Sequence, residues 1–509
     1  MQKRHNTSLK LLKTSEFTIN IDSLNLDLYK EEIDNYDNLN FPYQKFQFLI
    51  NALTNNLIYY DIFQQNINLY ANENHILHPT NDYNKFCIKK LDNFLKKYQE
   101  TRQLNINISE DLISKLISEL FTSNDITVKY TLLNSLVSFS SNSKFFNKCI
   151  SEDNKYMNYF FQFTYIKNYD MVISVLYIIF NVISDFPSRA ENIINNNPFH
   201  IRIKELIYDF LNRNEKNIEN IIDLLEILTL IISSINEDEY EKFKDIANMS
   251  YEIIQKTTNQ KLITTVLLLI LQITKNDEVS KEIVSCGLGS TLQNMLSEKY
   301  CEREYLINLL EIMINILYNN QISEFFLNSN ILNTYTKILN TYRNTANKDD
   351  DEIIYLCIFC LSNIAGGPQQ HCHVLIISNL PSLILEILKS KNGNKIYFET
   401  CNLFYNILQR CSTEDFCIII KMKIMKLFCE GLNKTINPDD ILLSLKGLFL
   451  LIQRNEEIYK TKQNLKNEFF GYTTKRTLEK YTYNPELQIS SLSEKILQIM
   501  GQPNDEDIF

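Results

Sequence analysis

The chain has 509 residues, a formal net charge of −10, and only nine glycines and nine prolines. Typical proteins use about 7% glycine and about 5% proline, so turn residues are scarce here. This scarcity disfavours an all-β fold and a glycine-rich nucleotide-binding α/β fold, and the long leucine and isoleucine runs predict an all-α fold. Binding to nucleic acid needs stripes of lysine and arginine, which this acidic sequence lacks, so nucleic acid is not an expected ligand.

Cysteine use and hydropathy indicate the expected compartment. Most of the eleven cysteines lie in apolar helical runs, where we expect them to pack as small core residues. No signal peptide is recognised at the start of the sequence, so a reducing cytosol or nucleus is the expected setting. The longest nearly apolar run, Leu262–Leu271, is shorter than the roughly 18 residues that a membrane span needs. We therefore expect no membrane insertion.

In chain order the sequence predicts a tail, a helical array and a second tail. We expect residues 1–40 to form a polar tail, residues 41–501 to form a solenoid, and residues 502–509 to form a short acidic tail. Phe41–Tyr70 and Asn84–Tyr98 have the pattern of opening helices that cap the array.

Later segments are expected to repeat one helical unit. Leu112–Phe121 followed by Tyr130–Ser138 is an example of its last two helices. The charged stretch Asn347–Glu352 has the composition of an insertion between units. Leu478–Met500 is expected to close the array.

A polar residue recurs at one matching position of successive apolar helices. The intervals between these positions are 47, 91, 43, 48 and 43 residues, and the longest divides near Leu230 into 49 and 42. A period of roughly 42 to 49 residues built only from helices is typical of an α-solenoid of the armadillo or HEAT kind. The recurring residues are Asn134, Asn181, Gln272, Asn315, Asn363 and Asn406.

We expect these residues to lie on the third helix of each unit, facing the concave surface. Residues four apart share a helix face, so each polar residue projects together with the residue one turn before it. Asparagine can donate to and accept from the backbone of an extended peptide, and an aromatic neighbour can hold a lysine or arginine stem. The alternative is that asparagine, which is common in this chain, lies on these helices through composition alone.

The segment Phe359–Gly367, with the sequence FCLSNIAGG, resembles the third-helix pattern W-A-L-S-N-I-A-x-G of the importin α family, with phenylalanine in place of tryptophan. Tyr177–Asp185 is similar to the third repeat of that family, including the acidic residue after the helix. The resemblance covers roughly residues 90–501 and implies a right-handed superhelical armadillo-repeat solenoid of about ten repeats. It also implies an adaptor, not an enzyme, that binds Lys/Arg-rich nuclear localisation signals of cargo proteins in cytoplasm and nucleus.

The resemblance implies two peptide-binding sites and further partners. Importin β and an export receptor would be the partners, and no cofactor or metal is implied. The major site would contain Tyr130, Asn134, Tyr177, Asn181 and Asp185. The minor site would contain Asn315, Phe359, Asn363, Glu399 and Asn406, with Asp185 and Glu399 pairing with basic residues of the signal.

The chain also departs from the family pattern. It has no tryptophan, Leu230 replaces one asparagine, and only Lys3-Arg4-His5-Asn6 resembles the basic segment through which the family binds importin β. The alternative function is therefore an armadillo-repeat scaffold, cytoskeletal or regulatory, that no longer binds localisation signals.

Catalytic and metal motifs are not evident. The phosphate-binding pattern GxxxxGK[ST], the dinucleotide-binding pattern GxGxxG and the hydrolase pattern GxSxG are all missing. His371-Cys372-His373 lacks a second set of ligands and is expected on a helix-turn surface. Cys357 and Cys360 lie in an apolar helix without the preceding strand of a redox motif, so we expect them in the core.

Overall fold

The computed structural model describes Lys89 and residues 110–212, 218–297, 303–345, 347–391, 393–459 and 475–500. These residues form helices, turns and short connections, and they contain no strand, so the prediction of an all-α fold is confirmed. The expected tails, 1–40 and 502–509, lie outside the described residues, and so do the expected opening helices except for Lys89, which is helical.

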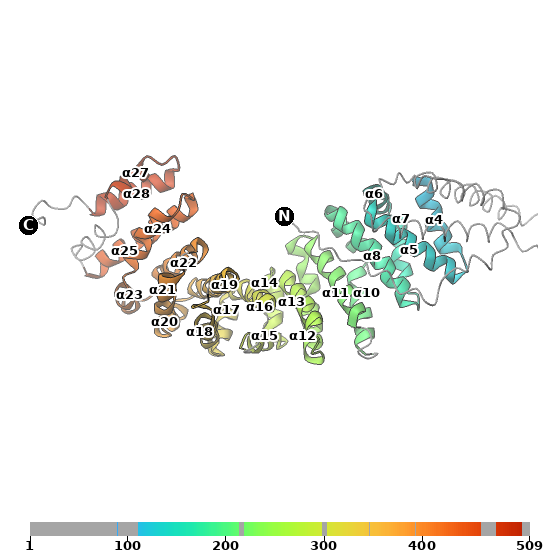
Figure 1. Ribbon diagram of the computed structural model, residues 1–509, viewed down its shortest axis with the longest axis horizontal. Coiled ribbons are helices and arrows are strands. Elements are labelled where there is room, and N and C mark those ends of the chain that lie inside the picture. The colour runs from blue at the N-terminus through green and yellow to red at the C-terminus, as the bar shows by residue number, and fades with distance from the viewer. Residues whose placement is uncertain are drawn as a thin grey trace, which may run out of the picture. The chain divides into compact units, whose positions relative to one another are not determined.

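The chain forms two compact units that meet at Asn236 and Glu237. The helices of unit 1 are α4 (Glu110–Thr122), α5 (Ile126–Asn142), α6 (Lys144–Glu152), α7 (Asn154–Phe163), α8 (Tyr169–Asp185), η4 (Pro187–Arg189), α9 (Ala190–Asn196), α10 (Phe199–Leu211) and α11 (Ile218–Ser233). Two complete three-helix repeats, α6–α8 and α9–α11, follow the partial repeat α4–α5 (Figure 1).

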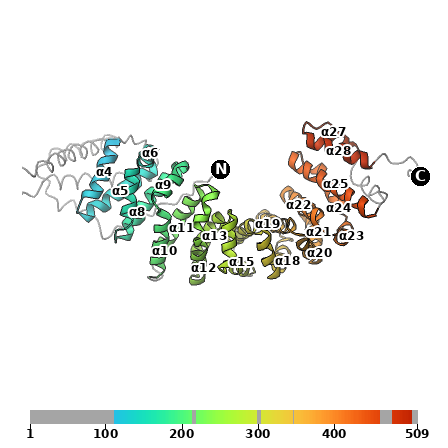
Figure 2. The same cartoon turned by 180° about the vertical axis from the view of Figure 1, so that it is seen from behind.

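Unit 2 continues the same three-helix repeat. In both views its helices follow one another from α12 to α28 (Figures 1 and 2). They are η6 (Glu237–Phe243), α12 (Asp245–Lys256), α13 (Gln260–Ile273), α14 (Asp277–Ser285), α15 (Leu288–Ser297), α16 (Arg303–Leu317), α17 (Asn320–Asn328), α18 (Ile331–Tyr342), α19 (Lys348–Ala365), α20 (Gln369–Ile377), α21 (Leu380–Ser390), α22 (Asn394–Arg410), α23 (Thr413–Ile420), α24 (Ile424–Lys434), α25 (Pro438–Tyr459), α27 (Lys475–Thr482) and α28 (Leu487–Met500).

The third helix of each repeat packs against the third helix of the next one. In unit 1 the packed series is α5, α8 and α11, and in unit 2 it is α13, α16, α19, α22, α25 and α28. These helices are the most apolar part of each repeat: α8 alone buries ten side chains, because its leucines, isoleucines and valines occupy all but one narrow face. The prediction that the recurring asparagines mark a row of third helices is confirmed.

Asparagine and aspartate begin many of the helices. Asp125 accepts from the backbone N–H groups of Thr127 and Val128 at the start of α5. Asn168 and Asn259 accept in the same way at the starts of α8 and α13. Such caps satisfy N–H groups that have no partner within the helix, so the polar residues between the apolar runs fix where each helix starts.

A left-handed backbone residue separates the first and second helices in four consecutive repeats of unit 2. These residues are Gly287, Asn330, Asn379 and Lys423, with φ values of 89°, 68°, 61° and 61°. Glycine and asparagine adopt this conformation at little cost, whereas lysine does so at a cost of about 1 kcal/mol. The sharp turn is therefore imposed by the packing of the repeat in each case, and it does not depend on glycine.

One sequence expectation about unit 2 is wrong, and the structure adds detail to another. The charged stretch Asn347–Glu352 is not an insertion, because residues 348–352 form the first turns of α19. Acidic residues near a helix N-terminus are stabilising, so this run starts the helix. The closing segment Leu478–Met500 is divided into α27 and α28, and Pro485 lies in the break because proline cannot continue a helix.

Within the described residues, no single helix has the length and apolar character to cross a membrane. Two bent helix pairs, Tyr169–Asp185 with Pro187–Asn196 and Gln369–Ile377 with Leu380–Ser390, meet that test together by length and composition only.

Candidate functional site

The recurring asparagines bind the preceding third helix. Asn181 Nδ2 donates to the hydroxyls of Ser140 and Ser141 on α5, at 2.9 and 3.2 Å. On α16, Asn315 Nδ2 donates to the hydroxyl of Thr274, just after α13, at 3.1 Å.

The same contact recurs in the next two repeats. Asn363 Nδ2 donates to the Ile314 carbonyl oxygen at 2.8 Å, and Asn406 Nδ2 donates to the Ser362 carbonyl oxygen at 3.0 Å. Four repeat interfaces are thus joined by one kind of hydrogen bond.

These bonds change the chemistry expected of the asparagine ladder. The sequence suggested that each amide would both donate to and accept from a bound peptide. In the structure the amide N–H groups serve the interface between repeats, and the four amide oxygens accept no hydrogen bond from the described residues. The ladder is therefore a row of acceptors, suited to the N–H groups of a partner.

The first predicted pair does not reach the surface. Tyr130 is 3% exposed and Asn134 is 8% exposed, so both are buried side chains of α5. They cannot form the wall and amide of a peptide pocket in this conformation. A tyrosine ring is mostly apolar, and burying it stabilises the fold. Sequence periodicity alone cannot distinguish a buried tyrosine from one on the binding surface.

Tyr177 is half-buried on α8 and lies beside acidic residues of α11. Its hydroxyl is hydrogen-bonded to Asp223, with Glu226 and Glu219 nearby. Burial first, and then the Asp223 carboxylate, raise the pKa of Tyr177 well above the usual range. The predicted aromatic wall is thus present in unit 1, but it is tied to a carboxylate that the sequence prediction did not include.

Asp185, the predicted partner for a basic side chain, ends α8 and is anchored internally. Asn147 of α6 is fully buried, and its Nδ2 donates to Asp185 Oδ2 at 2.8 Å. The same nitrogen donates to the Ser140 carbonyl oxygen at 2.7 Å. Asp185 therefore has one oxygen fixed within the repeat, and its role toward a basic partner stays a prediction.

Unit 2 places two aromatic rings of α19 beside the predicted Glu399. The centroids of Tyr355 and Phe359 are 6.0 Å apart on the same face of the helix. Glu399 of α22 accepts from Asn402 Nδ2 at 3.1 Å. Burial raises the pKa of Glu399, and hydrogen bonds from Asn402 and Ser362 partly offset that effect.

Two further carboxylates complete this region. Burial raises the pKa of Glu311 on α16, and the neighbouring Glu352 of α19 raises it further. Burial also raises the pKa of Tyr355, followed by the charges of Glu399 and Glu352. Glu352 therefore lies close enough to influence both Glu311 and Tyr355, and Glu399 lies close enough to influence Tyr355.

Lys395 of α22 contacts both a carboxylate and the tyrosine ring of this region. Its Nζ lies 3.2 Å from Glu352 Oε2 and 5.4 Å from the centroid of the Tyr355 ring. An ammonium group is therefore held by a carboxylate and an aromatic face at once. We call the group formed by Glu311, Glu352, Tyr355, Phe359 and Glu399 the acid–aromatic patch.

The acidic run at the start of α19 also positions this patch. Asp350, which is buried, pairs with Arg303 of α16 at 2.7 Å, and Asp351 pairs with Lys391, just before α22, at 2.7 Å. These pairs join α19 to its neighbours on both sides. They hold α19, which supplies Glu352, against the helices that supply Glu311 and Glu399.

The sequence predicted Phe359 and Glu399 as binding-site residues but did not predict Glu352 or Tyr355 as such. Tyr355 lies four residues before Phe359 and Glu352 lies seven before it, so all three share one helix face. Extending the predicted pairs by one or two turns toward the N-terminus would have found both.

The cysteines and histidines form no metal site within the described residues. Cys357 and Cys360 are fully buried in α19, as the sequence predicted. In α20, His371 and Cys372 are buried, so the expectation of a surface turn is wrong for them. His373 is exposed, and its Nδ1 lies 2.9 Å from Asp415 Oδ1 of α23.

Comparison with solved structures shows that this fold is also found in other proteins. No protein-family model matches the chain, and no curated protein matches it. A solved engineered protein is similar over 82% of this chain and 95% of its own, with a TM-score of 0.63 and 13% identity. A structure from work on a phosphorylation switch between cadherin and β-catenin covers 81% of this chain and 77% of its own, with a TM-score of 0.54 and 12% identity.

A designed armadillo repeat protein in complex with the peptide (KR)4 is similar over 51% of this chain and 99% of its own, with a TM-score of 0.42 and 16% identity. Three-helix repeats whose third helices stack in a row define the armadillo-repeat class. The chain is an all-α solenoid of this class.

Proposed function

We propose that the chain is an armadillo-repeat interaction protein that binds an extended Lys/Arg-rich segment of a partner protein at the acid–aromatic patch. The observation that carries this proposal is Lys395, whose ammonium group already lies between the Glu352 carboxylate and the Tyr355 ring. A lysine or arginine from a partner fits the same chemistry.

The patch has more negative charge than Lys395 neutralises. Glu311 and Glu399 both have a raised pKa, because burial disfavours their ionised forms and, for Glu311, the charge of Glu352 adds to that effect. A second cation would relieve that cost, because an opposite charge nearby stabilises an ionised carboxylate. The patch therefore has capacity for at least one basic side chain of a partner.

The row of asparagine oxygens suits an extended segment. The oxygens of Asn315, Asn363 and Asn406 lie on α16, α19 and α22, the three helices that supply the patch. Backbone N–H groups of an extended peptide could bond to this row while its basic side chains enter the patch. The neighbour from the cadherin and β-catenin study also supports a protein partner for this class.

The finer proposal is a nuclear import adaptor. Its partners would be cargo proteins with basic localisation signals, together with importin β and an export receptor, and it would act in cytoplasm and nucleus. The asparagines at 315, 363 and 406 support this proposal. It assigns binding rather than enzymatic activity to the groove.

The alternative is a scaffold that does not recognise localisation signals. Two observations favour it: the amide N–H groups of the ladder serve repeat interfaces, and the chain has no tryptophan. An indole wall contributes roughly 0.5–2 kcal/mol per cation, so its loss weakens signal binding.

Fluorescence anisotropy with labelled peptides tests the proposal. The probes are a Lys/Arg-rich localisation-signal peptide, a peptide of the same composition in scrambled order, and a version with every lysine and arginine replaced by glutamine. Binding at the acid–aromatic patch through charge alone predicts that both basic peptides bind and that the neutral one does not. Preference for the signal order supports the adaptor, and equal binding of both basic peptides supports the scaffold.

Matched variants locate the binding site. Glu311→Gln, Glu352→Gln and Glu399→Gln together remove three charges from the patch. The control removes three exposed carboxylates of first helices, at Glu278, Glu324 and Glu414. We expect the patch variant to lose at least tenfold in affinity and the control to lose much less. Equal losses would mean that net charge, not the patch, drives binding.

A further inference from the structure

Two turns near the C-terminal end of unit 2 share a sequence pattern. Thr435–Asp439 reads Thr-Ile-Asn-Pro-Asp, and Thr482–Glu486 reads Thr-Tyr-Asn-Pro-Glu. Equivalent positions are 47 residues apart, which is one repeat. Each turn connects the second helix of its repeat to the third, α24 to α25 and α27 to α28.

The asparagine of each turn accepts from the backbone N–H two residues later, at or just before the start of the next helix. Asn437 Oδ1 accepts from the Asp439 N–H at 3.1 Å, and Asn484 Oδ1 accepts from the Glu486 N–H at 2.9 Å. Proline follows each asparagine: Pro438 is the first residue of α25, where its missing N–H costs nothing, and Pro485 lies two residues before α28. The two turns therefore have the same rigid construction.

The residue before each asparagine is apolar and almost fully exposed. Ile436 is 96% exposed, Tyr483 is 88% exposed, and Leu487 at the start of α28 is 84% exposed. Large apolar side chains rarely project so far from a surface without a partner, and three of them together indicate an interaction site.

Other turns of the same kind show that this residue need not be apolar. Asn168 caps α8 and is preceded by Lys167, and Asn259 caps α13 and is preceded by Thr258. The cap forms equally with a polar residue at this position. The turn geometry therefore does not explain Ile436 and Tyr483.

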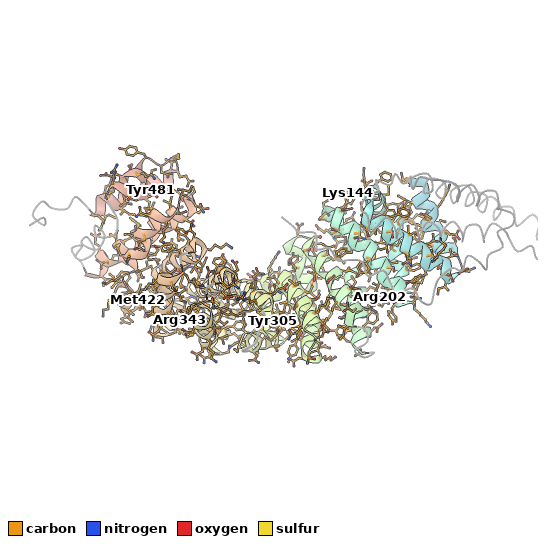
Figure 3. The ribbon with its side chains drawn as sticks, viewed as in Figure 1. Lys144, Arg202, Tyr305, Arg343, Met422 and Tyr481 are labelled. Atoms are coloured by element: carbon orange, nitrogen blue, oxygen red, sulfur yellow. The ribbon has the colours of Figure 1, made fainter. Side chains whose placement is uncertain are left out.

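The two turns lie next to each other. Their third helices, α25 and α28, pack together, and Tyr481 Oη donates to the Leu432 carbonyl oxygen at 2.7 Å (Figure 3). Tyr481 is two residues before Tyr483, and Leu432 is four residues before Ile436. The exposed side chains therefore form one apolar edge, which consists of Ile436, Tyr483 and Leu487.

An unpaired carboxylate accompanies each exposed side chain. Asp439 follows Ile436 by three residues and Glu486 follows Tyr483 by three, and both are exposed. Neither carboxylate pairs with a cation among the described residues. The nearby Lys434 and Lys480 lie instead over the rings of Tyr397 and Tyr481, at 4.7 and 5.9 Å from the centroids.

We propose that the apolar edge docks a partner protein whose surface has an apolar cleft bordered by lysine or arginine. The apolar side chains would enter the cleft, and the border would pair with Asp439 and Glu486. A second copy of this chain fits less well, because a symmetric contact would place these carboxylates against each other. The edge is separate from the acid–aromatic patch and does not rest on the function proposed for it.

Site-specific photocrosslinking in the full-length chain tests this proposal. A benzophenone amino acid replaces Ile436 or Tyr483 in cells, and the control places it at Lys167 or Thr258 in the matched turns. The protein crosslinked at 436 and 483 but not at the controls is then purified. Its affinity is measured for the wild type, for Ile436→Thr with Tyr483→Thr, and for Asp439→Asn with Glu486→Gln.

We expect at least a tenfold loss with the threonine pair, a smaller loss with the amide pair, and weaker binding as salt is raised. The circular dichroism spectrum and the urea unfolding midpoint should stay unchanged in both variants, which shows that they fold. Crosslinks to a second copy of the chain, crosslinks no stronger than at the control turns, or a partner whose affinity ignores both pairs would each overturn the proposal.

Discussion

Asn406 of α22 donates from Nδ2 to both the carbonyl oxygen and the hydroxyl oxygen of Ser362 on α19, at 3.0 and 3.1 Å. Ser362 is itself fully buried, so its carbonyl oxygen depends on this contact for a partner outside its own helix. Asn181, Asn315, Asn363 and Asn406 thus each stabilise the interface between two repeats, whatever else they bind.

Replacing Asn363 or Asn406 with alanine should lower the free energy of unfolding by roughly 1–2 kcal/mol each, because a partly buried carbonyl loses its donor. Urea unfolding monitored by circular dichroism measures the change in midpoint. Asn394→Ala is the control, because Asn394 is exposed at the start of α22. An unchanged midpoint in both variants would show that the amide bonds contribute nothing to the interfaces.

Removing the positive charge of Lys395 should strengthen binding of a basic peptide. Lys395→Gln frees Glu352 and the Tyr355 ring, and an exposed ion pair is worth roughly 0.2–1 kcal/mol. We therefore expect affinity to rise about two- to fivefold by anisotropy. Lys389→Gln makes the same change of net charge from an exposed position on α21. A loss of affinity in Lys395→Gln would mean that Lys395 supports the site rather than occupying it.

Binding and stability should respond to pH in opposite directions. Glu311 and Glu399 have a pKa raised above the ordinary carboxyl value of 4.5. A basic peptide needs the ionised carboxylates, so its affinity should rise as pH increases through the raised pKa. The folded protein holds these protons more tightly than the unfolded chain does. Their contribution to stability is therefore present below the unfolded pKa and is lost as pH rises through the folded pKa.

Anisotropy and urea unfolding between pH 4 and 7 measure both trends. In the double variant Glu311→Gln with Glu399→Gln, both the affinity and the free energy of unfolding should change less with pH than in the wild type. Profiles of the same shape in the wild type and in this variant would assign the pH dependence to other groups.

Replacing Lys423, whose backbone is in the left-handed conformation, with glycine should stabilise unit 2. Lys423→Gly removes the cost of a side chain at φ 61° without removing a buried contact, because Lys423 is exposed. We expect the free energy of unfolding to rise by up to about 1 kcal/mol. Lys421→Gly, at φ −66°, is the control and should be neutral or destabilising. Destabilisation at 423 would show that the lysine stem stabilises this turn.

The sequence predicted the repeat correctly because its strongest signal has a structural cause. Asn181, Asn315, Asn363 and Asn406 recur at the repeat interval since each bonds the preceding third helix. The last three donate to the carbonyl just before the matching position, at Leu271, Ile314 and Ser362, and Asn181 donates farther along α5, to Ser140 and Ser141. The same fact limits the functional interpretation. A residue that is needed at every interface recurs whether or not a peptide binds, so periodicity could not separate the two roles.

Other features depend on contacts that no single helix contains. Tyr130 and Tyr177 occupy matching positions, yet one is buried and the other meets Asp223, because their neighbours differ. The patch required the packing of α16, α19 and α22 to bring Glu311 near Glu352 and Glu399 near Tyr355. The left-handed turns were also missed, because only one of the four has glycine.

A double-mutant cycle between the patch and a basic peptide tests the central claim most directly. The cycle combines Glu352→Gln in the protein with a lysine-to-glutamine change at each position of the peptide in turn, and anisotropy measures the four affinities. The account predicts a coupling of about 1 kcal/mol or more at one peptide position, and little coupling for Glu324→Gln. Additive effects within about 0.3 kcal/mol at every position would contradict it, because no peptide cation would then contact the acid–aromatic patch.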